Sequence, residues 1–160
     1  HVRKVELCFL VLALVVGMGG SSVVQAHEEG AGILTPGPRF IALLNSGQVV
    51  ADTPSTSNAS GVAFLTFSPM ESELCWTLTF SGLEGTQLAA PSGAHIHGPA
   101  RPGRSNHNHV ADLASGSPLN GCETLIRDEV KWLKAGELYF QIHSDTFPDG
   151  EIRGQIVRLK

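Results

Sequence analysis

Short alternations of apolar and polar residues, separated by turn-forming residues, run through most of the chain from residue 39 onward. In residues 73–80 every second residue is large and apolar, which is the period of a strand with one buried face. Residues 137–143 alternate in the same way and would turn Leu138, Phe140 and Ile142 inward. Residues 62–67 are mostly apolar and predict a strand covered on both faces. The other predicted strands are residues 39–44, 94–98, 110–113 and 151–159.

Helical periodicity is scarce. The one candidate helix is residues 129–135, which Gly136 would end. Residues 52–61 and 99–108 are rich in Pro, Gly, Ser and Asn and predict loops. The pattern therefore predicts an all-β fold, a Greek-key-like β-sandwich or barrel of about seven or more short antiparallel strands.

The first residues have the features of a signal peptide. Arg3 and Lys4 are basic, and the apolar run that follows, residues 7–18, is short of the roughly 20 residues of a membrane-spanning helix. Small residues near Ala26 fit a cleavage site; an uncleaved membrane anchor is the alternative. We expect a signal peptide at residues 1–26, a flexible arm at 27–38 and one β domain at 39–160. The mature protein would be secreted, periplasmic or extracellular, without a membrane span.

The charge argues against two classes of partner. The chain has 15 acidic and 11 basic residues, and residues 27–160 keep 14 acidic and nine basic ones. This negative balance disfavours binding to nucleic acid or to anionic lipid. The sequence also lacks the GxSxG, P-loop, dinucleotide-binding and HExxH motifs.

Of the three cysteines, Cys8 lies in the predicted signal peptide. Cys75 and Cys122 remain as a pair in an oxidising compartment, which suggests a disulfide that closes a long loop. Two buried free thiols are the alternative.

The histidines carry the candidate chemistry. His95 and His97 are two residues apart on a predicted strand and so share one face. His143 lies on the polar face of another strand, so the three imidazoles would converge if the two strands are neighbours. Neutral imidazoles bind copper and zinc. Asp145 or Glu151 could add an oxygen ligand or accept an imidazole N–H.

Other roles for the histidines stay open. The three imidazoles could instead hydrogen-bond to these carboxylates and to backbone carbonyls, completing a polar layer without metal. His107 and His109 are either additional ligands or part of a solvated loop. Cleavage after residue 26 would leave His27 as an N-terminal residue whose amine and imidazole can chelate copper. Glu151 and Arg153 share one strand face and predict a structural ion pair.

Three motifs together resemble the CHRD domain, a family named for its repeats in chordin. They are AHIHGPA at residues 94–100, GELYFQIH at 136–143 and PDGEIRGQI at 148–156, and the resemblance extends over residues 39–159. It implies an extracellular or periplasmic β domain without established enzymatic activity. Two features depart from the family pattern: residues 48–54 replace an acidic-proline motif, and Ser144 stands where a threonine is common.

These observations favour a secreted, non-enzymatic binding or structural module whose histidine cluster could hold copper or zinc as its only cofactor. One alternative is a copper-dependent enzyme similar to superoxide dismutase, in which Arg153 would steer the anion. The other is a metal-free extracellular protein–protein interaction module.

Overall fold

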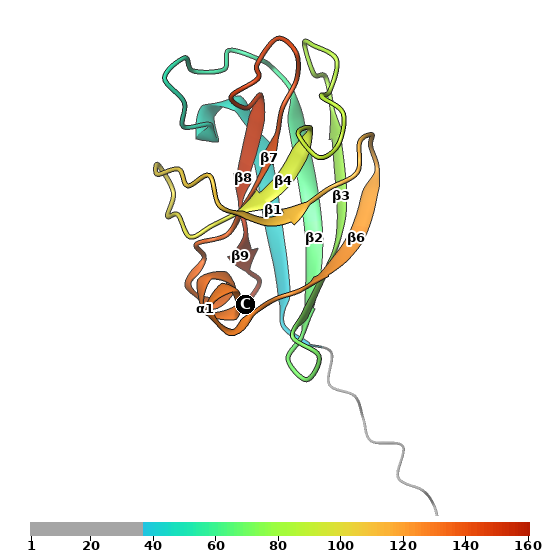
Figure 1. Ribbon diagram of the computed structural model, residues 1–160, viewed down its shortest axis with the longest axis vertical. Helices are drawn as coiled ribbons and strands as arrows, with labels where there is room; N and C mark the ends of the chain where they lie inside the picture. Colours follow the sequence, from blue (N-terminus) through green and yellow to red (C-terminus); the bar gives the residue numbers. More distant parts are fainter. Residues whose placement is uncertain (1–36) are drawn as a thin grey trace, which may run out of the picture. The chain divides into compact units, whose positions relative to one another are not determined.

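The computed structural model describes residues 37–160, whose strands form one curled antiparallel sheet, with an α-helix at one end (Figure 1). The predicted signal peptide and residues 27–36 of the predicted arm, His27 included, lie outside the described residues. The elements are β1 (Arg39–Asn45), the 3-10 helix η1 (Ser46–Gln48), β2 (Ser60–Ser68), β3 (Glu73–Ser81), β4 (Ala94–His97), β5 (His109–Asp112), β6 (Leu119–Thr124), α1 (Arg127–Ala135), β7 (Tyr139–Ile142), β8 (Ile152–Gln155) and β9 (Val157–Arg158).

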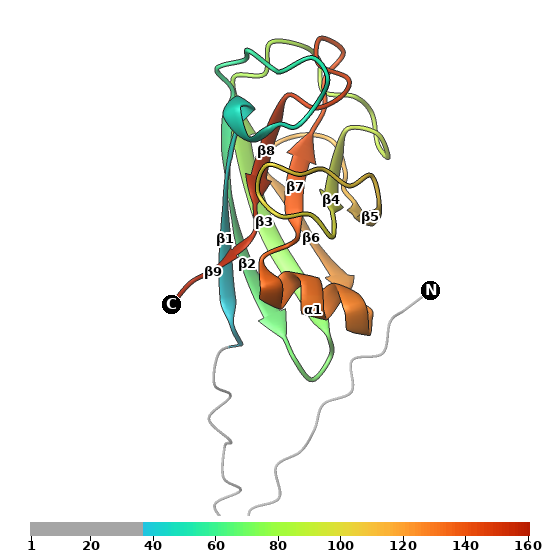
Figure 2. The ribbon, with the colours of Figure 1, turned by 90° about the vertical axis from the view of Figure 1, so that its left-hand side faces the viewer.

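The strands follow the order β5-β4-β7-β8-β1-β2-β3-β6, and β9 pairs with β1. β3 and β7 are separated by three strands in this order. The ring of Trp76 on β3 nevertheless meets the ring of Phe140 on β7 edge to face, with 6.3 Å between their centroids. The sheet therefore curls back on itself into a nearly closed barrel (Figure 2). This confirms the predicted all-β fold class.

The hydrophobic core lies inside the curled sheet and is formed by the apolar residues of the alternating strands. Leu138, Phe140 and Ile142 are all fully buried there, as the alternation predicts. The prediction that β2 is covered on both faces is wrong, because Phe64 is 58% exposed. Its neighbours across the sheet are Ile41 and Thr77, and this face of β1, β2 and β3 points outward. β2 thus buries one face only.

Helix α1, strand β6 and the last predicted strand show the main differences from the predicted elements. Helix α1 begins two residues earlier, because the Glu129 carboxylate accepts a hydrogen bond from the Ile126 N–H and closes the first turn (2.9 Å). It ends at Gly136, which adopts the left-handed conformation, as expected. Strand β6 was not predicted, because Leu119 is its only buried residue and no alternation of large apolar residues marks it. The predicted strand 151–159 divides into β8 and β9 at Ile156.

The predicted disulfide is present between Cys75 and Cys122, with 2.08 Å between the sulfur atoms. The two residues lie directly opposite each other on β3 and β6. The bridge therefore joins β6, at one end of the strand order, to its neighbour. Within residues 37–160, no helix is long and apolar enough to span a membrane.

Candidate metal centre

The outer face of β4, β7 and β8 carries polar side chains in register. β4 pairs with β7 and β7 pairs with β8, so the condition for the histidines to converge is met. One row across these strands consists of His95, Gln141 and Arg153, and the next consists of His97, Tyr139 and Gln155. Because residues two apart share a strand face, the two rows lie side by side.

Loops cover this polar face and hydrogen-bond to it. The Tyr139 hydroxyl donates to the Asn106 carbonyl (2.7 Å), and the Gln141 amide donates to the Asp149 carbonyl (2.6 Å). The second loop packs closely because Gly150, at φ +125°, has no Cβ to meet the Gln141 side chain. His95 is consequently only 4% exposed, although it points away from the hydrophobic core.

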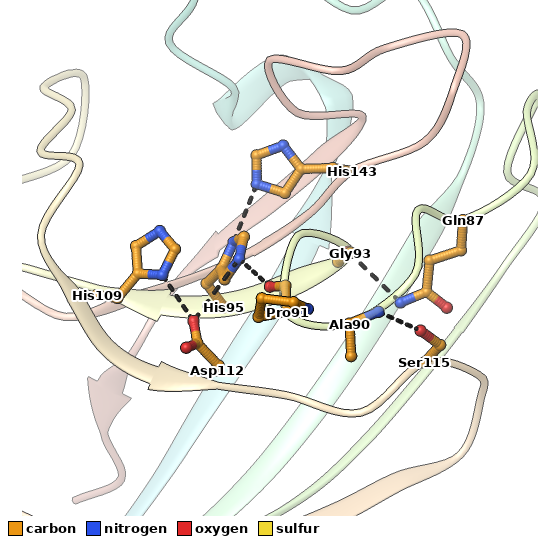
Figure 3. A network of polar contacts seen from close by, with 9 residues as sticks. All are labelled: Gln87, Ala90, Pro91, Gly93, His95, His109, Asp112, Ser115 and His143. Atoms are coloured by element: carbon orange, nitrogen blue, oxygen red, sulfur yellow. Dashed lines mark hydrogen bonds and ion pairs between the residues drawn. The ribbon is translucent and has the colours of Figure 1, made fainter.

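A cavity of about 530 Å³ remains between the loops and the sheet, and five histidines line it. The ligand atoms of His95, His97 and His143 lie within 4.8 Å of one another. The closest pair is His95 Nδ1 and His143 Nε2, at 3.2 Å (Figure 3). The predicted convergence of three imidazoles from two segments is therefore present in the fold.

Backbone carbonyls determine which ring nitrogens carry hydrogen. His95 Nε2 contacts the Pro91 carbonyl, and His143 Nδ1 contacts the Pro148 carbonyl at 2.8 Å. Since a carbonyl oxygen only accepts hydrogen bonds, both of these nitrogens carry the N–H. The opposite nitrogens, His95 Nδ1 and His143 Nε2, then face each other as two lone pairs. His97 Nδ1 is also buried and has no hydrogen-bond partner among the described residues.

Burial keeps these imidazoles neutral. It is the largest cause that lowers the pKa of His95 to about 4, and the nearby imidazoles of His109 and His143 lower it further. Burial, followed by the charges of the neighbouring histidines, lowers the pKa of His97 to about 3. The pKa of His143 is also lowered, again mainly by burial. At neutral pH the three rings are in the form that binds a metal ion.

His109 and His107 lie at the same cavity. His109 is the first residue of β5, and its Nδ1 is 2.6 Å from Asp112 Oδ1. The ring of His109 is 4.0 Å from that of His95 and 4.8 Å from that of His97, centroid to centroid. Asp112 was missed by the sequence reasoning, although its position three residues after His109 could have suggested the contact.

The two carboxylates expected to support the site have other partners. Asp145 Oδ1 accepts a hydrogen bond from the Thr86 N–H (2.9 Å). Glu151 Oε1 accepts from the Ser57 hydroxyl and from the Glu84 N–H, both at 2.6 Å. Within the described residues, the hydrogen bonds of these two carboxylates include none to an imidazole.

Arg153 belongs to the polar face and is only 1% exposed. Its guanidinium stacks on the Tyr139 ring, 3.6 Å from the centroid, and donates to the Gln155 side chain (3.2 Å). The expected ion pair with Glu151 is absent from the ion pairs of residues 37–160. The carboxylate turns instead toward Ser57, in the loop before β2. Burial also lowers the pKa of Arg153.

The comparison with known families agrees with the sequence resemblance. The sequence model of the CHRD domain matches residues 40–156. This span contains His95, His97, His143 and the His109–Asp112 pair. No curated protein and no solved structure matches the chain.

Proposed function

The chain belongs to the CHRD domain family, and from this premise we propose that it is a non-enzymatic binding module that holds one transition metal ion, copper or zinc, between His95, His97 and His143. The module would act outside the cytoplasm, as the family membership and the predicted signal peptide suggest.

The observation that carries the proposal is the orientation of the rings. His95 and His143 turn their N–H groups to carbonyls and their lone pairs toward each other, 3.2 Å apart. Two facing lone pairs repel unless a cation lies between them. Metal-binding histidines typically donate their second ring nitrogen to a carbonyl or carboxylate in this way. Neutral imidazole nitrogens suit copper and zinc.

The charge around the cavity favours binding of a cation over turnover of an anion. Apart from histidines, the ionisable side chains that line it are Asp52, Asp149 and the phenol Tyr139. Negative carboxylates attract a metal cation and repel superoxide. Arg153, which would steer the anion in a superoxide dismutase-like enzyme, is buried and does not line the cavity.

A metal-free protein–protein interaction module is the second candidate. Leu43, Phe64 and Val157 are exposed on the outer face of β1, β2 and β9, and an exposed group of apolar side chains is typical of a protein-binding surface. Pull-down from the extracellular fraction tests this candidate. A specific partner should be retained by the wild-type protein and lost with Phe64→Ser.

The metal proposal is tested by analysing tag-free protein for metal and then titrating it with Cu(II) and Zn(II) in a calorimeter. We expect about one equivalent to bind, and binding to be lost in His95→Ala and His143→Ala. The exposed His107 provides the matched control, since His107→Ala should keep the site. Unchanged binding in His95→Ala and His143→Ala would contradict the proposal. If metal binding were then lost only in His27→Ala, the binding site would lie at the N-terminus of the mature protein.

The copper-loaded protein should also be assayed with superoxide. Because the carboxylates around the cavity repel the anion, we expect no consumption above that of free Cu(II). Rapid consumption that His143→Ala abolishes would favour the enzyme instead.

A further inference from the structure

A β-bulge places His109 beside the metal cavity. β5 pairs with β4 at one end of the strand order, where His95 lies opposite Asp112. If this register continued, Val110 would lie opposite His97. The register shifts instead, so that His109 lies opposite His97 and Val110 packs into the core. Bulges commonly re-aim side chains in this way.

The ring of His109 lies beside the rings of His95 and His97. Its centroid lies closer to that of His95 (4.0 Å) than the centroid of His97 does (5.0 Å). The side chain is 44% exposed, so its ring can turn toward a metal ion without disturbing the core.

Asp112 fixes the His109 ring in the same way that carbonyls fix the others. Asp112 Oδ1 lies 2.6 Å from His109 Nδ1. Because an ionised carboxylate only accepts hydrogen bonds, Nδ1 carries the hydrogen and Nε2 keeps its lone pair. A carboxylate in this position orients a metal-binding imidazole and makes it more basic. Its negative charge, 3.8 Å from His95 Nε2, also offsets the charge of a bound cation.

We infer that His109 is a fourth imidazole ligand of the metal ion and that Asp112 is its positioning residue. This inference rests on the proposed function, because the fourth ligand needs the ion held by His95, His97 and His143. A set of four imidazole nitrogens suits the tetragonal coordination that Cu(II) prefers.

Pulsed electron paramagnetic resonance of tag-free protein loaded with one equivalent of Cu(II) tests the inference, because it counts bound imidazoles through their remote ring nitrogens. We expect four imidazoles in the wild-type protein and in the His107→Ala control. His109→Ala should show three and bind Cu(II) about tenfold more weakly or worse. Metal-free unfolding curves verify that each variant is folded.

The positioning role of Asp112 is tested by the effect of its substitution on the His109 imidazole. Asp112→Asn should weaken Cu(II) binding about 10- to 100-fold, as substitutions of such outer partners commonly do. It should also shift the remote-nitrogen signal of a single imidazole, which a purely structural role would not do. Asp112→Glu should recover part of the affinity. Unchanged signals in Asp112→Asn would overturn the positioning role.

The outcomes separate this inference from the proposed function. If His109→Ala keeps four imidazoles and full affinity while His143→Ala loses the metal, the three-histidine site stands and the fourth ligand is refuted. If neither substitution changes Cu(II) binding, both proposals fail together.

Discussion

Acidification is expected to destabilise the metal-free protein through His95 and His97. In the unfolded chain both imidazoles titrate near the ordinary pKa of 6.5, whereas in the fold these pKa values are lowered to about 4 and about 3. At pH values between these lowered pKa values and 6.5, the two imidazoles bind protons in the unfolded chain and remain neutral in the folded chain. Stability is therefore fully present above pH 6.5 and decreases as the pH falls below it.

The size of the stability loss follows from the pH range between the pKa values in the fold and in the unfolded chain. Each histidine that is neutral in the fold and protonated in the unfolded chain costs about 1.4 kcal/mol per pH unit. Between pH 7 and pH 5 this amounts to about 2 kcal/mol for each ring and about 4 kcal/mol for the pair. Because a domain has a total stability of about 5–15 kcal/mol, the loss should be easily measured.

Urea unfolding at pH 7 and at pH 5, with a chelator present, measures this loss. The matched control is the double variant His95→Gln/His97→Gln, whose amides do not titrate. Carboxylates and His143 remain in both proteins, so their contributions cancel in the comparison. We expect the wild-type protein to lose about 4 kcal/mol more than the variant. Equal losses in the two proteins would refute the idea that buried, neutral imidazoles cause the pH dependence.

The remaining predictions concern the metal, the disulfide and the core. Cu(II) or Zn(II) at about 100 times its dissociation constant should stabilise the protein by about 2.7 kcal/mol in thermal unfolding, and His143→Ala should remove this gain. Cys75→Ala/Cys122→Ala opens a bridge with a sequence separation of 47 and should cost about 4 kcal/mol in urea unfolding; a cost near zero would contradict the loop-closure reasoning. Phe140→Ala should cost about 3–5 kcal/mol, whereas Phe64→Ala, at an exposed position, should change stability by about 0.5 kcal/mol or less; similar costs would contradict the assignment of the two faces.

Much of the candidate site could be predicted from alternation alone. The two-residue period places His95 and His97 on one face and puts His143 on the same side as Gln141. Convergence of the imidazoles required the two strands to be neighbours, and the pairing of β4 with β7 meets this condition. The family resemblance in the motifs at residues 94–100 and 148–156 is confirmed by the match over residues 40–156.

Other features could not be predicted because they depend on contacts between distant segments. The exposure of Phe64 depends on which face of β2 the core occupies, and an apolar run does not specify this. The ion pair expected between Glu151 and Arg153 is replaced by a contact with Ser57, which lies 94 residues before Glu151 in the chain. A pattern within one strand carries no information about such a partner.

Most strands, the polar face that carries the imidazoles and the two cysteines that could pair are evident in the sequence alone, because they follow from the local alternation of side chains and from residue chemistry. The folded structure is needed to see which ring nitrogens keep their lone pairs, since the Pro91 and Pro148 carbonyls reach the rings from loops. The same is true of His109, which lies opposite His97 because the register between β4 and β5 shifts after Ile96. Strand registers and loop contacts involve segments that are distant in the chain. They form only in the folded protein, so a local sequence pattern does not specify them.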